Sequence, residues 1–212
     1  MSETLRAYKF YSADRALQNL AQTRLKISTL DDLNDPFEFR NFNFPSEVSR
    51  EIWEKTRAHL FSDNGIICFC RDWSNPVIWS HYADNHRGLA LGFDIPKSHV
   101  LPVEYRKVRK RLPELSKLPS SKLMPLVQGA LTTKFKHWEY ENEVRMFSNA
   151  DEKCMNTGLF FKSFDKGLVL REIIIGPLSG VTSQEIAEHI DLTLVKIVTS
   201  RLAFTKYSVV RQ

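Results

Sequence analysis

Hydrophobic residues recur along the chain with the spacing of short strands separated by helices. Alternating or continuous apolar runs predict strands at residues 5–11, 25–28, 65–70, 89–95, 100–105, 138–147, 169–175, 192–198 and 202–210. The run at 65–70 has no polar break, which is typical of a strand buried on both faces. The chain is therefore predicted to be rich in short strands.

Helices are predicted where apolar positions follow a helical period behind a capping residue. These segments lie at residues 12–22, 46–61, 77–84, 121–131 and 182–189. Asn75 before Pro76 marks one helix start, and Thr182 with Glu185 forms a capping box at another. Because strands and helices do not alternate strictly, the order predicts an α+β fold and not a doubly wound sheet.

The composition is that of one globular domain. The 212 residues are 42% hydrophobic and 26% charged, which excludes disordered, collagenous and coiled-coil classes. We expect a single domain over residues 1–212. No apolar run is long enough for a transmembrane helix, and the start of the chain lacks a signal-peptide pattern. Three cysteines are too few for a disulfide framework, so we expect a cytoplasmic protein without a membrane partner.

The net charge of +5 is concentrated in one segment. Between Lys97 and Lys122 there are eight basic and two acidic residues, so this segment carries +6 and the rest of the chain −1. Three prolines in it indicate an insertion, at about residues 97–122, that is mostly loop. One interpretation is a solvated loop, and the other is a surface for nucleic acid or an acidic protein.

Two glutamates in the predicted strand at 138–147 are candidates for catalysis. Glu141 and Glu143 are two residues apart, so on a strand both project from one face, about 6–7 Å apart. Neighbouring carboxylates raise each other's pKa and can divide electrostatic and hydrogen-bonding roles, whereas Arg145, two residues further on, favours the ionised forms. The alternative is the solvated outer face of an edge strand.

The segment Asn34-Asp35-Pro36-Phe37-Glu38 is first of all a turn signal. Asp35 can cap a turn, and Pro36 holds the residue before it extended. The functional interpretation places Asn34, Asp35 or Glu38 around a polar ligand near a strand end.

The short predicted helix at 77–84 carries aromatic residues and a histidine. Trp79 and Tyr82 are three residues apart and share a face, so they can stack on a flat ring such as a base or nicotinamide. His81 can act as a general acid–base. The alternatives are two core aromatic residues and a hydrogen-bonded surface histidine.

Metal and phosphate motifs are weak in this sequence. Cys68-x-Cys70 with His81 and His86 matches no standard zinc spacing, so we expect no metal. None of the eight glycines belongs to a dinucleotide or phosphate-binding loop, and no nucleophile elbow occurs. These classes of nucleotide-binding protein and hydrolase are therefore not indicated.

Several motifs follow one another along nearly the whole chain. They are Leu-Asn-Asp-Pro-Phe-Glu at 33–38, Ile-Trp-Ser-His-Tyr-Ala-Asp at 78–84, Arg-Gly-Leu-Ala-Leu-Gly-Phe-Asp at 87–94, and Lys134 with Trp-Glu-Tyr-Glu-Asn-Glu-Val-Arg at 138–145. Together they resemble a widespread bacterial family filed only as a domain of unknown function. The family name carries no activity.

The order of these parts is also similar to the ADP-ribosyltransferase superfamily. In those enzymes a first strand grips NAD, a middle segment packs on nicotinamide, and a late strand carries the catalytic Glu, often in an E-x-E motif. The resemblance implies a split, twisted, mixed or antiparallel β-sandwich with flanking helices. It also implies NAD as the substrate, without a metal.

The resemblance implies a role for individual residues. Glu143 would hold the nicotinamide ribose hydroxyl and stabilise an oxocarbenium-like transition state, and Glu141 would orient the acceptor. Tyr82 or Trp79 would pack on nicotinamide. The first-strand contact falls on Tyr8 or Lys9, where the superfamily has His or Arg. Further NAD contacts are expected from Tyr11, Asn34, Asp35, Phe37, Glu38, His81 and Arg145.

The leading hypothesis is an ADP-ribosyltransferase-like toxin or phage-defence effector that transfers ADP-ribose from NAD to a macromolecule or water. The basic segment between Lys97 and Lys122 would guide the acceptor, and a partner or antitoxin protein is not specified. The alternatives are a nucleic-acid-binding module, a non-catalytic interaction domain, or a metal-dependent nuclease. The nuclease would use as ligands Asp35, Glu38, Glu141 and Glu143.

Overall fold

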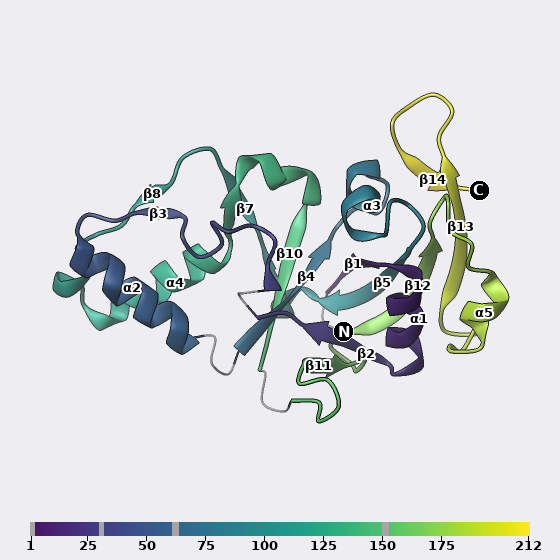
Figure 1. The fold of residues 1–212 in the computed structure, drawn as a ribbon, viewed down its shortest axis with the longest axis horizontal. Coiled ribbons are helices and arrows are strands. Elements are labelled where there is room, and N and C mark those ends of the chain that lie inside the picture. The colour runs from purple at the N-terminus through teal and green to yellow at the C-terminus, as the bar shows by residue number, and fades with distance from the viewer. Residues whose placement is uncertain (1–2, 30–31, 61–63, 150–152) are drawn as a thin grey trace.

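The computed structural model describes residues 3–29, 32–60, 64–149 and 153–212. It is a mixed α+β fold, as predicted, in which a curled sheet is flanked by helices (Figure 1). The helices are α1 (Ala13–Ala21), α2 (Glu47–Leu60), α3 (Pro76–Tyr82), α4 (Ser120–Leu131) and α5 (Ser183–Ala187), with short 3₁₀ helices η2 (Lys97–His99), η3 (Leu115–Lys117) and η4 (Lys136–Glu141).

Most strands belong to one eight-stranded sheet with the order β14-β13-β12-β5-β1-β4-β10-β6. Within this sheet β12 and β13 run parallel, and the other pairs are antiparallel. The strands are β1 (Thr4–Tyr11), β2 (Arg24–Ile27), β3 (Phe42–Asn43), β4 (Asn64–Cys70), β5 (Leu89–Pro96), β6 (Leu101–Pro102), β7 (Glu104–Arg106), β8 (Lys110–Arg111), β9 (Thr133–Phe135), β10 (Glu143–Asn149), β11 (Phe160–Ser163), β12 (Val169–Ile175), β13 (Lys196–Leu202) and β14 (Val209–Arg211).

The sheet is weakly joined between β1 and β4. Along β1, all eight residues pair with β5, whereas Tyr8 opposite Cys70 is the pair that joins β1 to β4. On its other edge β4 pairs with β10 along its whole length. Because β4 ends at Cys70, the two strands separate on the side of Tyr8 that leads toward Tyr11, and this split opens space beside their side chains.

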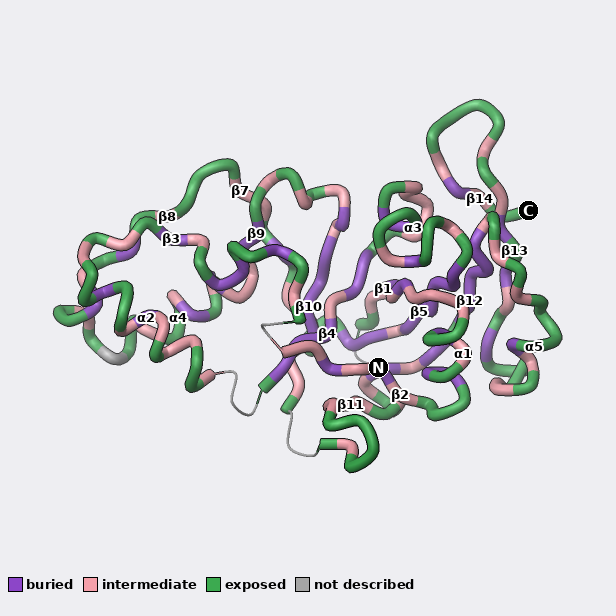
Figure 2. The backbone as a smooth tube through the Cα atoms, in the orientation of Figure 1, coloured by how far each residue is buried: buried purple, intermediate pink, exposed green. Residues whose placement is uncertain are grey.

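Side-chain alternation along the strands divides the core between the two faces of the sheet. Ala7 packs on the face covered by α1, with Leu20 and Phe93. Its neighbour Tyr8 points to the opposite face, which is covered by α3 and Trp79. Figure 2 shows the central strands β4, β5 and β10 as largely buried. The predicted double-sided burial of β4 is confirmed, since Ile66, Ile67 and Phe69 are all buried.

A second packed region, the α2/α4 lobe, is built from β3, α2, β8, η3 and α4. Its own core contains Phe39, Trp53, Leu112, Leu115 and Val127. It lies at the left end of the molecule in Figure 1, with α2 and α4 side by side. The rings of Phe39 and Trp53 stack at 4.8 Å, and Trp53 Nε1 donates to the Phe39 carbonyl at 2.8 Å.

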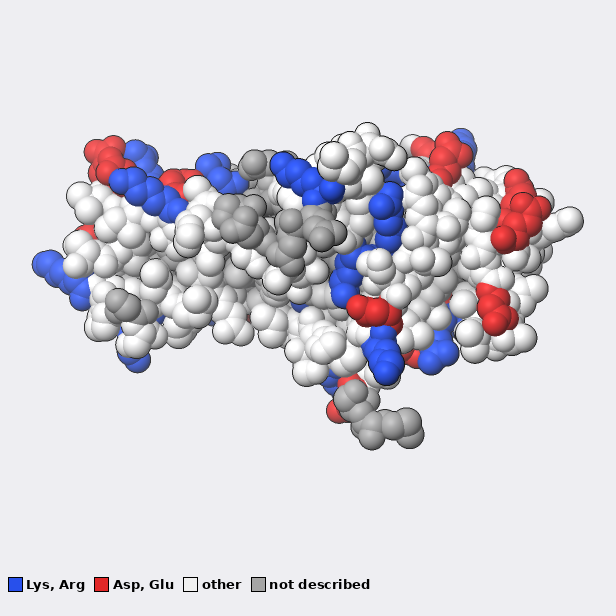
Figure 3. Space-filling view, turned by 90° about the horizontal axis from the view of Figure 1, so that it is seen from below, with Lys and Arg blue, Asp and Glu red and all other residues white. Residues whose placement is uncertain are grey.

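The basic segment at 97–122 is more ordered than the predicted loop. It supplies η2, β6, β7, β8 and η3, and β8 pairs in parallel with β3. Leu112 and Leu115 anchor it in the core of the α2/α4 lobe, and Lys107, Arg109 and Arg111 are exposed. Charge is uneven elsewhere too: on the face in Figure 3, Lys and Arg form a band near the middle, and acidic side chains gather toward the end where β13 lies.

The predicted strand at 138–147 is wrong in its first half. Residues 136–141 form η4, Asn142 takes a left-handed conformation with φ 45°, and β10 begins at Glu143. Asn is among the residues that tolerate this conformation, so the chain can turn there. The alternation of large and acidic residues that mimics a strand is produced here by a short helix.

The last two strands begin later than predicted. The predicted run at 192–198 starts as a turn, because Asp191 accepts hydrogen bonds from the Thr193 amide at 2.9 Å and from its hydroxyl at 2.7 Å.

The capping box of Thr182 and Glu185 is confirmed at α5, and the Asn75 cap is confirmed at α3. Within the described residues, no helix is long and apolar enough to span a membrane.

Candidate functional site

A cavity of about 170 Å³, the carboxylate pocket, lies at the split between β1 and β4. Lys9 and Phe10 of β1 form one wall, and Cys68 to Cys70 of β4 form another. The turn before β3 and the η4–β10 junction supply most of its charge. Its charged and polar lining includes Lys9, Ser28, Asp32, Asn34, Glu38, Tyr82, Lys134, Glu141 and Glu143.

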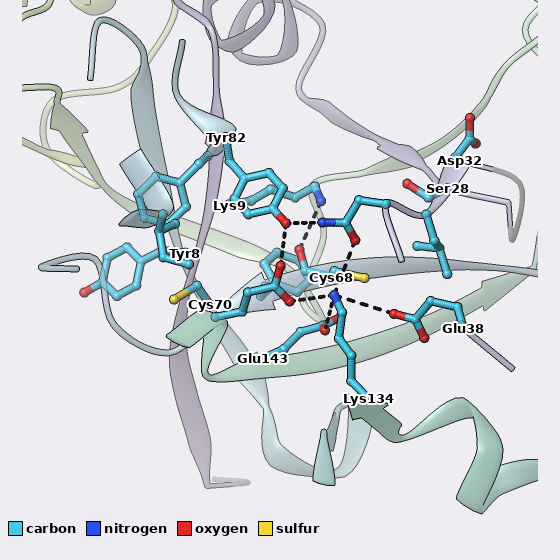
Figure 4. Close-up of a pocket in the computed structure, with 16 residues that line it drawn as sticks. Tyr8, Lys9, Ser28, Asp32, Glu38, Cys68, Cys70, Tyr82, Lys134 and Glu143 are labelled. Atoms are coloured by element: carbon cyan, nitrogen blue, oxygen red, sulfur yellow. Dashed lines mark hydrogen bonds and ion pairs between the residues drawn. The ribbon is translucent and has the colours of Figure 1, made fainter. Parts of the chain in front are cut away.

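Lys134 of β9 stands at the centre of this lining. Its Nζ lies 2.6 Å from Glu141 Oε2 and 3.6 Å from one oxygen each of Glu38 and Glu143. Asn34 Oδ1 is 3.4 Å away, and the ring of Trp138 lies beneath at 4.7 Å. Figure 4 shows the ammonium group pointing into the ring of acceptors. The side chain is 4% exposed, so this cation is held by the pocket and not by solvent.

Arg145 of β10 joins two of the same carboxylates from behind. Its two terminal nitrogens reach both oxygens of Glu38 at 2.6 and 2.9 Å, and Nε and Nη2 reach those of Glu143 at 2.9 and 3.1 Å. Nη1 also donates to the Leu131 carbonyl at 2.7 Å. This planar, forked geometry is the one for which Arg is suited. Both carboxylates are thereby locked in position.

The two locked glutamates respond differently to burial. Burial alone would raise the pKa of Glu143, but Arg145 and Lys134 outweigh it and hold that pKa below its ordinary value. Burial dominates at Glu38 and raises its pKa despite Arg145. Burial also acts to lower the pKa of Lys134, yet Glu143, Glu141 and Glu38 together raise it. Lys134 is therefore a permanent cation near neutral pH.

Glu141 is held by a different set of partners. The Tyr82 hydroxyl donates to Glu141 Oε1 and accepts from Asn34 Nδ2, as Figure 4 shows for Tyr82. Burial raises the pKa of Tyr82, and the adjacent Glu141 raises it further, so the hydroxyl keeps its proton. Glu141 and Glu143 reach one pocket from two elements, because the left-handed Asn142 separates η4 from β10.

Lys9 and the two thiols complete the inner wall. Lys9 Nζ donates to the Cys68 carbonyl at 3.0 Å, and burial lowers the pKa of this lysine. Burial raises the pKa of Cys68 and brings that of Cys70 to about 12, so both thiols stay protonated. They are poor nucleophiles in this state.

The charges of the pocket cancel when all groups are ionised. Four carboxylates, Asp32, Glu38, Glu141 and Glu143, line the pocket, and they are matched by four cations, Lys9, Lys26, Lys134 and Arg145. Lys9 is the cation whose pKa burial lowers, and it has no carboxylate partner within the described chain. The lining itself holds four carboxylates and two lysines, so carboxylates outnumber cations at the surface of the cavity.

No protein-family model, curated protein or solved structure matches this chain significantly.

The structure brings together many of the residues that the sequence singles out. Tyr82, Glu141, Glu143, Asn34, Glu38 and Lys9 line the carboxylate pocket, and Arg145 holds two of its walls. The solvated-strand alternative for the acidic pair is wrong, because Glu141 is 6% and Glu143 4% exposed.

Trp79 and His81 lie elsewhere. Trp79 is fully buried, meets the ring of Phe10 edge-on at 5.0 Å, and donates from Nε1 to the Trp73 carbonyl at 2.6 Å. It is a core residue and cannot stack on a ligand without unfolding its surroundings. His81 is exposed, with Nδ1 3.2 Å from the Tyr140 hydroxyl.

Four other predicted residues are only partly associated with the pocket. Tyr8 lines it with its ring, but its hydroxyl points away in Figure 4 and donates to Glu172 at 2.7 Å. The Tyr11 ring lies 5.9 Å from Lys9 Nζ, outside the lining. Asp35 accepts the Phe37 amide at 2.9 Å, the turn-capping role. Phe37 is 52% exposed and faces another cavity.

Lys134 is the central residue that was not among the sequence candidates. Its place within the quoted motifs, four residues before Trp138, is a signal that could have found it. Cys68 and Cys70, which the sequence offers only as a poor match to a zinc site, also line the pocket, and so does Ser28, which has no sequence signal for a site. Asp35 lies outside the lining, so the four carboxylates of the nuclease alternative do not converge. Among the described residues, no group of His, Cys, Asp or Glu forms a metal-binding cluster.

Proposed function

We propose that this protein is an ADP-ribosyltransferase-like enzyme that cleaves the bond between nicotinamide and ribose in NAD. The observation that carries the proposal is the convergence of Glu141, Glu143 and Tyr82 on one pocket whose lining holds more carboxylates than cations. The nicotinamide ring of NAD is positively charged, and the transition state for its departure places positive charge on the ribose. Buried carboxylates stabilise both.

The position of the pocket also supports the proposal. The motif resemblance requires a first strand and a late acidic strand at one site, and here β1 and β10 both border the carboxylate pocket. The single residue pair between β1 and β4 is compatible with the split sheet that the resemblance implies. A cavity of about 170 Å³ takes one end of a dinucleotide, so the adenosine part would lie outside it.

Within this proposal we give the reacting role to Glu141. Each glutamate is bonded through both oxygens, Glu143 by the Arg145 guanidinium and Glu141 by the Tyr82 hydroxyl and the Lys134 ammonium. The forked pair with Arg145 neutralises Glu143, whereas Lys134 is shared among three carboxylates, so Glu141 keeps more of its negative charge. In the reaction the C–N bond breaks, and its electron pair leaves with neutral nicotinamide. The oxygen of water or of an acceptor hydroxyl then bonds to the ribose carbon, and its proton passes to solvent. Glu141 would stabilise the intervening positive charge, and Glu143 would hold the framework.

Cellular role and location are part of the same proposal. The three cysteines are free thiols, which suits a reducing compartment such as the cytoplasm. Transfer of ADP-ribose to a macromolecule would make the protein a toxin or a phage-defence effector, as the resemblance implies.

Release of nicotinamide from NAD tests the proposal. We expect the wild-type protein to release nicotinamide, measured by chromatography, and Glu141→Gln to lower the rate by roughly 100-fold or more. Glu188→Gln, an exposed carboxylate outside the pocket, is the matched control and should keep the wild-type rate. Circular dichroism would establish that each variant is folded.

Equal rates for the wild type and Glu141→Gln, or no release with any acceptor tried, would contradict the proposal. Glu143→Gln separates the two glutamates. A loss of activity accompanied by a lower melting temperature fits the framework role, and a loss without any change in stability reverses the assignment.

A further inference from the structure

A second cavity of about 290 Å³ adjoins the carboxylate pocket, and Lys134 lines both. We call it the basic pocket. Its other lining residues come from the turn before β3, the β7–β8 segment and β9, and those used below are Phe37, Asn41, Arg106, Lys107, Arg109 and Phe135.

The basic pocket carries an excess of positive charge. Arg106, Lys107 and Arg109 fall within four residues, and Glu104 is the acid beside them. Glu104 is already shared, since it pairs with Arg106 at 2.6 Å and with Lys110 at 3.0 Å. Lys107 and Arg109 have no carboxylate partner within the described chain. They are available for an anion.

Two exposed aromatic rings border the same cavity. Phe37 is 52% and Phe135 42% exposed, although both are large apolar side chains. The Arg109 guanidinium lies 4.8 Å from the Phe37 ring, and the Phe135 ring stacks on His137 at 4.6 Å. Aromatic rings interleaved with cations are the combination that stacks bases and pairs phosphates.

Polar groups in the wall have unused hydrogen-bonding capacity. Asn41 donates to the Ala130 and Thr133 carbonyls at 2.8 and 2.9 Å, which leaves its Oδ1 buried without a donor in the described chain. Arg106 Nε is likewise buried without an acceptor there. Such groups are rare in folded proteins, and beside a cavity they mark a place where a polar ligand can supply the missing bond.

The basic pocket continues into a third hollow. Arg109 also lines a cavity of about 570 Å³, together with Phe42, Phe44 and Arg50. Shared residues thus connect three hollows in a row, through Lys134 and then through Arg109. The basic pocket and the third cavity have aromatic and cationic side chains in their walls, and together they suit a chain-like ligand better than a single nucleotide.

We infer that the basic pocket binds single-stranded nucleic acid, with phosphates at Lys107 and Arg109 and an unpaired base against Phe37. A duplex hides the faces of its bases, and the carboxylates of an acidic peptide offer no flat ring to the exposed phenylalanines. Because Lys134 is common to both pockets, the bound strand passes beside Glu141. Binding of the strand does not depend on the proposed function, but a role of the strand as the acceptor of ADP-ribose does.

Fluorescence anisotropy with labelled single-stranded RNA and DNA of about 16 nucleotides tests this inference without NAD. We expect binding that weakens as salt rises, and Phe37→Ala to weaken it roughly 5- to 100-fold. Lys107→Gln and Arg109→Gln should each reduce the slope of log affinity against log salt by about 0.7. Lys206→Gln, an exposed lysine on the β13–β14 connection, is the matched charge control.

Several results would overturn the inference. They are no binding of either single strand at low salt, duplex DNA bound as tightly as single strands, or polyglutamate bound equally with no effect of Phe37→Ala. An effect of Lys206→Gln as large as that of Lys107→Gln would also count against the site. If the protein binds single-stranded nucleic acid but releases no nicotinamide from NAD, the proposed function is contradicted and this inference is not.

Discussion

Removal of the Arg145 side chain should leave two buried carboxylates without their ion-pair partner. Arg145 is 1% exposed and donates five hydrogen bonds, four of them to Glu38 and Glu143. Loss of one partner from such a buried ion pair costs about 3–5 kcal/mol. For a chain of this size, each kcal/mol lowers the melting temperature by about 2–4 °C, so Arg145→Met should melt roughly 6–20 °C lower at pH 7.

The loss of stability in Arg145→Met relative to the wild type should be smaller at acidic pH. In the wild type the pKa of Glu143 is lower in the folded than in the unfolded state, so Glu143 stabilises the fold at pH values above its unfolded-state pKa. This stabilisation is lost as the pH falls through the folded-state pKa. In Arg145→Met, burial without the arginine raises the pKa of both Glu143 and Glu38. As the pH falls from 7 toward 5, protonation of these carboxylates removes the unpaired buried charges from the variant. The free energies of unfolding of the variant and the wild type therefore become more similar.

Urea unfolding at pH 7 and pH 5, followed by circular dichroism, measures both effects. Glu38→Gln combined with Arg145→Met removes one stranded charge and should recover part of the loss. A deficit under about 1 kcal/mol at pH 7, a deficit independent of pH, or no recovery in the double variant would refute the ion-pair account.

Two further predictions concern residues outside the ion pairs. Trp79→Ala should lower the free energy of unfolding by about 3–5 kcal/mol, because Trp79 fills the core beside Phe10, and an unchanged urea midpoint would contradict this. Hydrogen bonding by the Thr157 side chain lowers the pKa of Cys154 to about 7, whereas burial brings that of Cys70 to about 12. N-ethylmaleimide at pH 7 should therefore label Cys154 before Cys70. Equal labelling rates for the two cysteines, measured by peptide mass spectrometry, would contradict this prediction.

Much of the fold could be predicted because its signals are local. The apolar runs of β1, β4, β5 and β12 mark central strands, and capping at Asn75 and Thr182 marks two helix starts. The α+β class follows from their order alone. The η4 helix was missed because its alternating residues match a strand period over a few positions, and a single left-handed Asn142 decides the outcome.

The candidate site could be predicted only in part, since its decisive contacts are distant in sequence. Arg145 and Glu38 are 107 residues apart, and Lys134 and Asn34 are 100 residues apart. Spacing along one strand shows that Glu143 and Arg145 share a face. It does not show that the face is buried against the turn at 34–38 or that Lys134 enters from another strand.

Calorimetric binding of NAD compared with NADH tests the central claim most directly, because the two differ in the charge of the nicotinamide ring. A pocket of buried carboxylates predicts that NAD binds more tightly than NADH, by roughly tenfold or more, equivalent to about 1.4 kcal/mol. Glu141→Gln should reduce that preference. Equal or tighter binding of NADH, or no binding of either, would contradict the account.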